Sequence, residues 1–217
     1  MPDLLIKLIL IRHGRTPGNL ERRYVGRTDE SLDAEAAHSL EASRGAMPAG
    51  VSFVYTSPMR RCRETARILF PDNEAAVADG FRECDFGDFE YKNFEELSAD
   101  SDYQAWIDSG GKLSFPGGED PQRFRERTVR AFDGMIGDII RAETAGTAAD
   151  TVTAALICHG GTVMSVLGRY SRPHRDYFDW MLPNGGWYQA QIDAGRWAAG
   201  ERYISAVQAG FTGEMIW

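Results

Sequence analysis

Two short apolar runs, each leading into a histidine and a glycine, constrain the fold of this chain more than any other feature. The first run covers residues 4–11 (LLIKLILI) and the second covers residues 151–158 (TVTAALIC). Runs of this length, almost wholly apolar, are typical of strands buried on both faces, as in a parallel sheet. We therefore expect two central strands that lead into Arg12-His13-Gly14 and His159-Gly160.

The rest of the chain alternates between strand and helix patterns. Asp33 and Pro58 are residue types that favour the start of a helix. Alternation of this kind indicates an α/β fold, and we expect a three-layer sandwich with a mainly parallel central sheet. Further strands are predicted at 51–56, 75–78, 189–192 and 203–208, and helices from Asp33 to about 47, from Ser57 and Pro58 to about 70, over 119–143 and over 160–170.

Residues 80–118 have a different character from the rest of the chain. They are rich in glycine, aromatic and acidic residues and lack a sustained periodicity. We predict a lid-like insertion with one or two short helices, and both a solvated lid with aromatic anchors and a plain satellite core remain open. Nothing in the sequence suggests a dividing linker, so residues 1–217 are expected to form a single domain.

Charge and composition exclude several classes of partner. The net charge of −8 argues against binding to nucleic acid or to an anionic membrane, so neither is expected. No apolar run approaches the roughly 18 residues that a membrane-spanning helix needs, and the start, Met-Pro-Asp, lacks the basic segment of a signal peptide. A cytoplasmic protein is expected. Cys62, Cys84 and Cys158 match no zinc-binding spacing and are expected to be free and buried.

The two strand-end histidines predict a binding site. In open α/β sheets, ligands bind outside the carboxyl ends of the strands. If both strands are central and parallel, the imidazoles of His13 and His159 face one crevice. Each histidine is followed by glycine, which lets the backbone approach a ligand closely, and a helix N-terminus after His159 favours an anion.

Four separate blocks of residues give this site a family resemblance. Residues 10–16 (LIRHGRT) with Asn19, the spacing of Ser57, Arg61, Thr65 and Ala66, the segment Phe81-Arg82-Glu83, and residues 156–161 (LICHGG) occur in that order. Together they resemble the signature of the histidine phosphatase (phosphoglycerate mutase-like) superfamily.

The resemblance implies a role for each of these residues. His13 would be the nucleophile and form a phosphohistidine, and Glu83 would be the general acid. Arg12, Arg61 and His159 would bind the phosphate oxygens, and Asn19 would assist them. Gly160, at the start of the following helix, would offer a backbone N–H.

This set of residue types suits phosphoryl transfer without a metal. The transition state is loose, so positioning and charge stabilisation dominate catalysis. An imidazole is largely unprotonated at neutral pH, and guanidinium groups bind phosphate in a bidentate manner. A two-histidine, one-carboxylate metal site of His13, Glu83 and His159 is an alternative, but no H-E-x-x-H spacing supports it, so neither a metal nor a cofactor is expected.

The chain departs from the family pattern at a few positions. Cys62, Phe89 and Tyr91 stand where many relatives have alanine, tryptophan and glycine. We expect none of them to touch the chemistry, and we expect Phe89 and Tyr91 to lie beside the substrate. Four arginines either extend the anion-binding surface or pair with nearby carboxylates: Arg15, Arg22, Arg23 and Arg27.

The function predicted from the sequence is hydrolysis of a small phosphorylated metabolite through a phosphohistidine. The short stretch between Glu83 and His159 resembles the branch that includes alpha-ribazole phosphatases, which implies alpha-ribazole 5′-phosphate as one candidate substrate. A phosphoglycerate mutase is the alternative enzyme. A non-catalytic phosphate-binding module is the alternative of another class. The oligomeric state is not predicted.

Overall fold

A central sheet organises the computed structural model, which describes residues 4–145 and 150–210. Its six strands lie in the order β3–β2–β4–β1–β5–β6. Strands β3, β2, β4 and β1 are parallel, whereas β5 is antiparallel to β1 and β6 to β5. The strands are β1 (Leu5–Arg12), β2 (Val51–Thr56), β3 (Ala75–Val77), β4 (Thr151–Cys158), β5 (Trp187–Asp193) and β6 (Ser205–Ala209).

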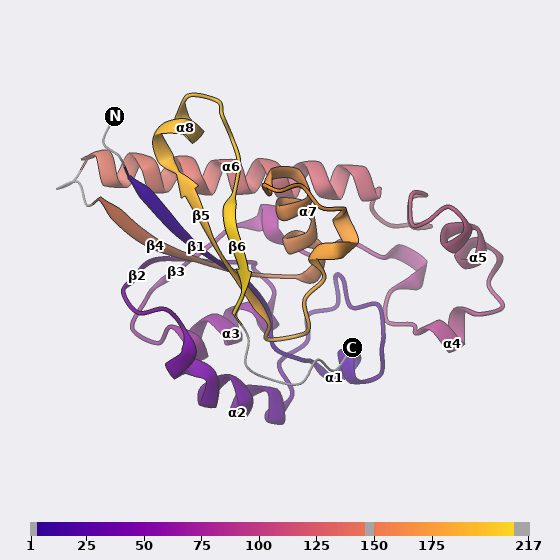
Figure 1. Ribbon diagram of the computed structural model, residues 1–217. Coiled ribbons are helices and arrows are strands. Elements are labelled where there is room, and N and C mark those ends of the chain that lie inside the picture. Colours follow the sequence, from indigo (N-terminus) through magenta and orange to yellow (C-terminus); the bar gives the residue numbers. More distant parts are fainter. Residues whose placement is uncertain (1–3, 146–149, 211–217) are drawn as a thin grey trace.

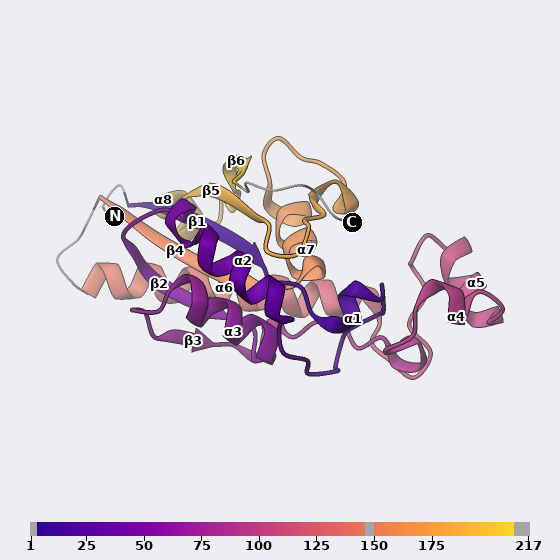
Figure 2. The ribbon, with the colours of Figure 1, turned by 90° about the horizontal axis from the view of Figure 1, so that it is seen from below.

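Helices cover both faces of this sheet. Helices α2 (Ala34–Ser43) and α3 (Arg60–Leu69) pack on one face, and α6 (Pro121–Ala145) and α7 (Gly160–Tyr170) pack on the other (Figures 1 and 2). The predicted three-layer α/β sandwich with a mainly parallel central sheet is therefore confirmed.

The apolar runs explain why both faces are covered. Along β1, Leu8 and Leu10 pack toward α6 and α7, whereas Ile9 and Ile11 pack toward α2 and α3. All four side chains are fully buried. Burial of each such side chain contributes roughly 1.5–3 kcal/mol, so a strand that is apolar on both faces is stable only between two layers.

The helix boundaries follow local capping chemistry. The Asp33 carboxylate accepts a hydrogen bond from the backbone N–H of Ala36, as expected for the residue that starts α2. That helix ends at Ser43, earlier than predicted, and a 3-10 turn over Arg44–Ala46 follows. Helix α3 begins at Arg60 rather than at Ser57, because the N–H of Ser57 still bonds to the β4 carbonyl of Ile157.

The insertion at 80–118 has its own aromatic core and lies beyond one end of the sheet (Figures 1 and 2). A 3-10 turn at Asp79–Phe81 leads into the insertion, and a second 3-10 turn covers Gly87–Phe89. The short helices α4 (Phe94–Leu97) and α5 (Ser101–Asp108) follow. The core of the insertion includes Phe89, Tyr103 and Phe115 and is completed by Phe124 from α6. The insertion is thus anchored to the main helical layer.

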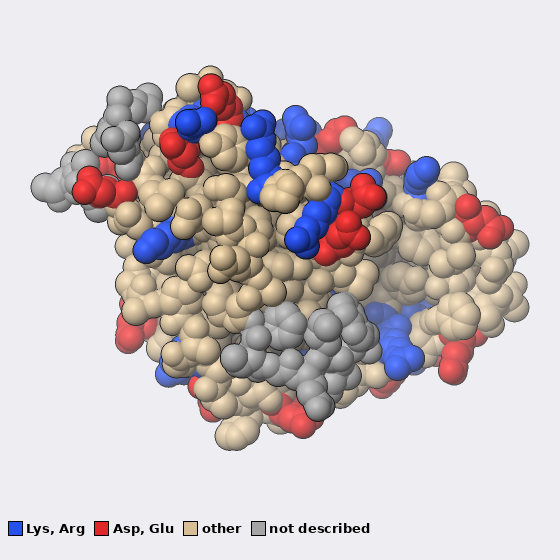
Figure 3. All heavy atoms as spheres, in the orientation of Figure 1, with Lys and Arg blue, Asp and Glu red and all other residues tan. Residues whose placement is uncertain are grey.

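Outside the insertion and the turn that leads into it, three short elements were not predicted: α1 (Pro17–Leu20), α8 (Ala194–Ala198) and a 3-10 turn over Tyr177–Trp180. Each has only four or five residues, too few for a periodic pattern. Over residues 4–145 and 150–210, none of the helices combines the length and apolar character needed to cross a membrane. On the face in Figure 3, acidic and basic side chains are interspersed.

Candidate active site

Two histidines from distant parts of the sequence meet at the carboxyl end of the sheet. Strands β1 and β4 are parallel neighbours, with Arg12 in register with Cys158. The backbone N–H of His13 donates to the carbonyl of Cys158 at 2.9 Å. The ring centroids of His13 and His159 lie 5.2 Å apart in an edge-to-face arrangement. The two imidazoles therefore share one crevice, as the strand-end pattern predicted.

The hydrogen bonds of His13 define which ring nitrogen is available. Its Nδ1 lies 2.7 Å from the carbonyl oxygen of Gly14. A carbonyl only accepts, so Nδ1 carries the proton and Nε2 has a free lone pair. Burial, followed by the positive charges of Arg61 and Arg12, holds the pKa of His13 well below its usual value. At neutral pH this imidazole is uncharged and suited to nucleophilic attack.

His159 is held between a hydroxyl and a thiol. Its Nε2 lies 2.8 Å from Oγ of Ser57 and 3.6 Å from Sγ of Cys62. Burial and the nearby charge of Arg61 hold the pKa of His159 well below its usual value, so the ring is neutral in this structure. Burial also raises the pKa of the Cys62 thiol to about 12, which keeps the thiol protonated. Cys62 therefore contacts the ring of a predicted site residue, although we expect the thiol itself to take no part in the chemistry.

Arg61 is a fully buried side chain anchored by a loop. From helix α3 its Nη1 donates to the carbonyl of Thr28, and its Nη2 to those of Val25 and Gly26. Its Nε–H has no partner within residues 4–145 and 150–210. Burying such a cation without a counter-ion is costly. The arrangement suits a site in which an anion supplies the missing partner.

Arg12 presents a second guanidinium to the same region. Its Nη1 donates to the carbonyl of Leu182 at 2.5 Å, and its Nε–H also lacks a partner in the described part of the chain. Burial lowers the pKa of Arg12, and the negative charge of Glu83 opposes that shift. Because arginine keeps its proton in proteins, the site holds two positive charges beside two neutral imidazoles.

Glu83 is the carboxylate of the site. It follows the turn at Asp79–Phe81, and its Oε1 accepts from the N–H of Cys84 at 3.0 Å. Burial raises the pKa of Glu83, against the opposing effects of that hydrogen bond and of Arg61. The proton is therefore retained to higher pH than in an exposed glutamate, before any phosphate is present.

Arg127 of α6 fixes the backbone that carries Glu83, a contact that the sequence analysis missed. Its guanidinium donates to the carbonyls of Gly80, Arg82 and Glu83. It also forms a bidentate ion pair with Glu119. No sequence signal identifies this residue, because the carbonyls that it binds lie in a loop about 45 residues earlier in the chain.

Two glycines start the helix that follows His159. Gly160 lies beside Arg12, whose Cζ is 3.6 Å from the position that a Cβ at residue 160 would take. A Cβ at Gly161 would stand 2.8 Å from Oε1 of Glu83 and 2.9 Å from the ring of Phe124. Such distances are too short for a side chain, so Gly161 is required for Glu83 to lie against this helix.

Asn19 lies at the edge of the site within a capping network. Its Oδ1 accepts from the N–H of Thr16 and from Nδ2 of Asn184. The same Nδ2 lies 3.3 Å from the carbonyl of His13. Asn19 is thus linked to the His13 segment through Asn184, which the sequence analysis also missed.

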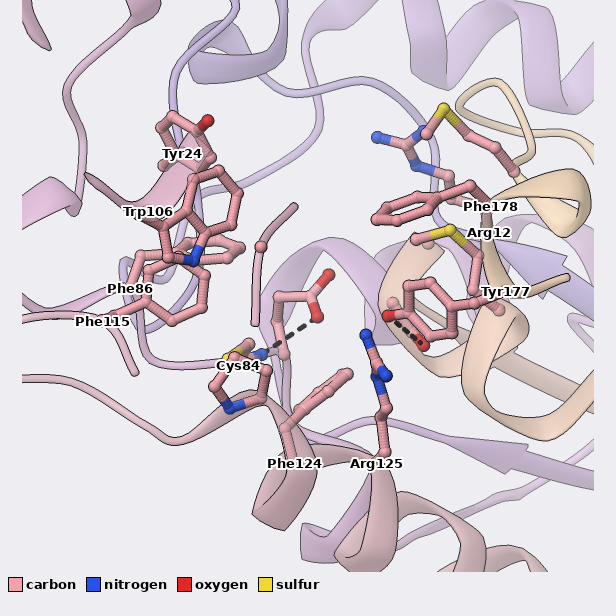
Figure 4. Close-up of a pocket in the computed structure, with 17 residues that line it drawn as sticks. Arg12, Tyr24, Cys84, Phe86, Trp106, Phe115, Phe124, Arg125, Tyr177 and Phe178 are labelled. Atoms are coloured by element: carbon pink, nitrogen blue, oxygen red, sulfur yellow. Dashed lines mark hydrogen bonds between the residues drawn. The ribbon is translucent and has the colours of Figure 1, made fainter. Parts of the chain in front are cut away.

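A cavity of about 310 Å³ opens beside Arg12, Glu83 and Gly160. Figure 4 shows aromatic rings of Tyr24, Phe86, Trp106 and Phe115 on one side of it and Tyr177 and Phe178 on the other, with Phe124 and Arg125 between. Phe89 and Tyr91 are absent from the described lining. Phe89 is buried in the core of the insertion behind the lining residue Phe115, and Tyr91 bonds to Glu30 on the surface. Their expected place beside the substrate stays a prediction.

The loop arginines mostly pair with carboxylates. Arg15 bonds to Asp33 and Glu35. Arg23 contacts Glu21 and Glu96, and Arg27 contacts Asp85. These contacts favour a paired, structural role over an extended anion-binding surface. Among the described residues, no three histidine, cysteine or acidic side chains gather as a set that could hold a metal ion.

Comparison with known proteins agrees with this architecture. The family model of the histidine phosphatase superfamily (branch 1) matches residues 8–203. The adenosylcobalamin/alpha-ribazole phosphatase of Escherichia coli is 30% identical over 131 residues, covering 58% of this chain and 64% of that protein. A probable phosphoglycerate mutase of Klebsiella pneumoniae is 31% identical over 130 residues, covering 57% and 60%. The match thus spans less than two thirds of these relatives.

Solved structures share the fold over most of the chain. A putative alpha-ribazole-5′-P phosphatase from Escherichia coli superposes with a TM-score of 0.79 at 19% identity, covering 95% of this chain and 96% of that one. A phosphoglycerate mutase from Thermus thermophilus gives a TM-score of 0.67 at 26% identity, covering 95% and 99%. Likeness of fold alone does not distinguish the two reactions.

Proposed function

Since this chain belongs to branch 1 of the histidine phosphatase superfamily, we propose that it hydrolyses phosphate monoesters of small metabolites through a phosphohistidine on His13. One observation carries this proposal. An uncharged, buried imidazole with a free Nε2 lies beside Arg12 and Arg61, and each of these arginines has an Nε–H without a partner in the described residues. A tetrahedral phosphate dianion offers an acceptor to both Nε–H groups and a phosphorus atom for Nε2 of His13 to attack.

The first half-reaction transfers the phosphoryl group to the enzyme. Nε2 of His13 attacks phosphorus, a P–N bond forms and the P–O bond to the alcohol breaks. Arg12, Arg61 and His159 bind the other phosphate oxygens, assisted by the N–H of Gly160 and by Asn19. Glu83, whose pKa is raised by burial, gives its proton to the leaving oxygen.

The second half-reaction returns the enzyme to its starting state. Water attacks the phosphohistidine, and the Glu83 carboxylate takes a proton from it. The P–N bond breaks, its electron pair returns to Nε2, and phosphate leaves with the new oxygen. A dianion between His159 and the arginines also favours a protonated His159 during turnover, which adds a third positive charge.

A phosphoglycerate mutase is the second candidate, because several relatives carry that name as probable and a solved structure carries it. The first half-reaction is the same, and the phosphoryl group then passes to a second hydroxyl instead of water. The relatives named as alpha-ribazole phosphatases make alpha-ribazole 5′-phosphate a candidate substrate for hydrolysis. A non-catalytic phosphate-binding module is disfavoured, because it would not need Glu83 beside the anion site.

Product analysis separates these functions. The protein is incubated in excess chelator with 3-phosphoglycerate, sugar phosphates, alpha-ribazole 5′-phosphate and p-nitrophenyl phosphate, and the products are identified. Free phosphate supports the proposal, and an isomerised ester supports a mutase. Absence of turnover with every ester supports the non-catalytic module. Activity that is lost in chelator and restored by a divalent metal contradicts the metal-independent mechanism.

A further inference from the structure

Building on the proposed function, we infer that the alcohol part of the substrate is apolar and contains a planar ring, which binds between two sets of mainly aromatic side chains beside Glu83. We call the first set the insertion wall (Tyr24, Phe86, Trp106 and Phe115) and the second the loop wall (Tyr177, Phe178 and Met181). Arg12, Glu83 and Gly160, which take part in the proposed chemistry, line the same cavity.

The insertion wall is preorganised. The ring centroids of Phe86 and Phe115 lie 5.1 Å apart, and those of Trp106 and Phe115 lie 5.2 Å apart. The Tyr24 hydroxyl bonds to the hydroxyl of Tyr103. These rings hold one another in place without a ligand, so a flat apolar group that binds against them does not bear the cost of ordering them.

The loop wall leaves apolar surface exposed at the mouth of the cavity. Phe178 is 58% exposed and Met181 is 42% exposed, and both line it. Figure 4 shows the Phe178 ring across the cavity from Tyr24 and Trp106. Exposed apolar side chains that gather at a cavity are typical of a ligand-binding surface. A planar ring bound between the insertion wall and the loop wall would cover the apolar surface of both.

The apolar lining of the cavity disfavours an acidic alcohol part. The proposed chemistry already uses Arg12 and Glu83. Among the other described lining residues, only Arg125 is charged, and its guanidinium lies over the Tyr177 ring, with Cζ 4.2 Å from the ring centroid. A carboxylate in the middle of this cavity would leave water for a surface made mainly of aromatic rings, a cost that an uncharged ring avoids.

A series of esters with similar primary-alcohol leaving groups tests this inference. We would measure kcat/KM for ethyl, benzyl and 2-naphthylmethyl phosphate, with 3-phosphoglycerate as the acidic comparison. A nucleoside 5′-monophosphate shows whether a ring attached through a sugar is also accepted. We expect kcat/KM to rise roughly ten- to a hundredfold from the ethyl to the naphthylmethyl ester, because a ring of this size leaves water on binding.

A pair of surface variants links the preference to the loop wall. Phe178→Ser is expected to lower the naphthylmethyl-to-ethyl ratio by about tenfold. Phe94→Ser is the matched control, because Phe94 is 63% exposed on α4 and is not among the described residues of the cavity lining. This control should keep the wild-type ratio. Both side chains are exposed, so neither change should prevent folding.

The outcomes separate this inference from the proposed function. If ethyl phosphate or 3-phosphoglycerate is hydrolysed as efficiently as the ring-containing esters, or if Phe178→Ser behaves like Phe94→Ser, the substrate inference is wrong while phosphatase activity stands. If no ester is hydrolysed, p-nitrophenyl phosphate included, and His13 is never phosphorylated, both are wrong.

Discussion

Oε1 of Glu83 lies only 2.8 Å from the point where a side chain at Gly161 would place its Cβ. The proposed acid is therefore packed against the first turn of α7, next to the helix N-terminus that follows His159. This contact links the position of Glu83 in the loop to the histidine at the end of β4. A single methyl group added at residue 161 tests whether this contact fixes the position of the Glu83 carboxyl.

We predict that Gly161→Ala impairs proton transfer more than phosphate binding. The methyl group would displace the Glu83 carboxyl, and a misplacement of about 1 Å can cost about 10²-fold in rate. The measurement is kcat for an alkyl phosphate, which needs a protonated leaving group. Gly134→Ala in α6 is the control, because its Cβ would meet no atom within 4 Å. Equal kcat values for the two variants would refute the packing argument.

Glu83→Gln should affect substrates according to their leaving groups. An alkoxide needs a proton in order to leave, whereas a nitrophenolate needs little help. We expect the rate of phosphoenzyme formation to fall strongly for alkyl phosphates and only slightly for p-nitrophenyl phosphate, as measured by rapid quench. In the wild-type protein, the alkyl rate should also fall as pH rises through the raised pKa of Glu83. Equal losses for both substrates would count against Glu83 as the acid.

The same variant should change how stability depends on pH. In the folded protein the pKa of Glu83 is raised, so its stabilising contribution is complete below the unfolded pKa of about 4.3 and is lost as pH rises through the folded pKa. Gln does not titrate. We therefore expect the Tm of Glu83→Gln to rise relative to that of the wild type as pH increases from below the unfolded pKa of about 4.3 through the raised folded pKa, as followed by calorimetry. A constant difference in Tm across that range would contradict the burial of a titrating carboxyl.

Arg61→Ala should be among the most damaging substitutions. It removes a phosphate-binding charge, which typically costs on the order of 10³-fold in rate. It also leaves the carbonyls of Val25, Gly26 and Thr28 without their donor, so a lower Tm is expected as well. Arg63→Ala, an exposed position on the same helix, serves as the control. A loss of only a few-fold in kcat/KM for Arg61→Ala, similar to that for Arg63→Ala, would contradict the phosphate-binding role of Arg61.

The main strands and the two histidines were predictable because they depend on local pattern. An apolar run of this length is typical of a central strand between two layers, and Arg12-His13 and His159 directly follow the two runs of this kind. The antiparallel direction of β5 was not predictable, because short strands carry no information on direction. The turns at α1 and α8 are too short to show a helical period.

The surroundings of the site were only partly predictable. Glu83 was identified by resemblance alone, since a single glutamate in a loop has no distinguishing pattern. Arg127, Ser57 and Asn184 act through contacts with residues far along the chain, and one sequence does not reveal such pairings. The aromatic residues of 80–118 were predicted as a group. Which of them face the cavity depends on side-chain direction within irregular loops.

The most direct test of the central claim is chemical trapping of the covalent intermediate. The protein is mixed with a ³²P-labelled phosphomonoester, quenched within milliseconds and mapped by peptide analysis, in parallel with His13→Ala. The account predicts an acid-labile phosphoryl group on His13, formed at least as fast as turnover, and no label and no turnover in the variant. Label on another residue, or full activity of His13→Ala, would contradict it.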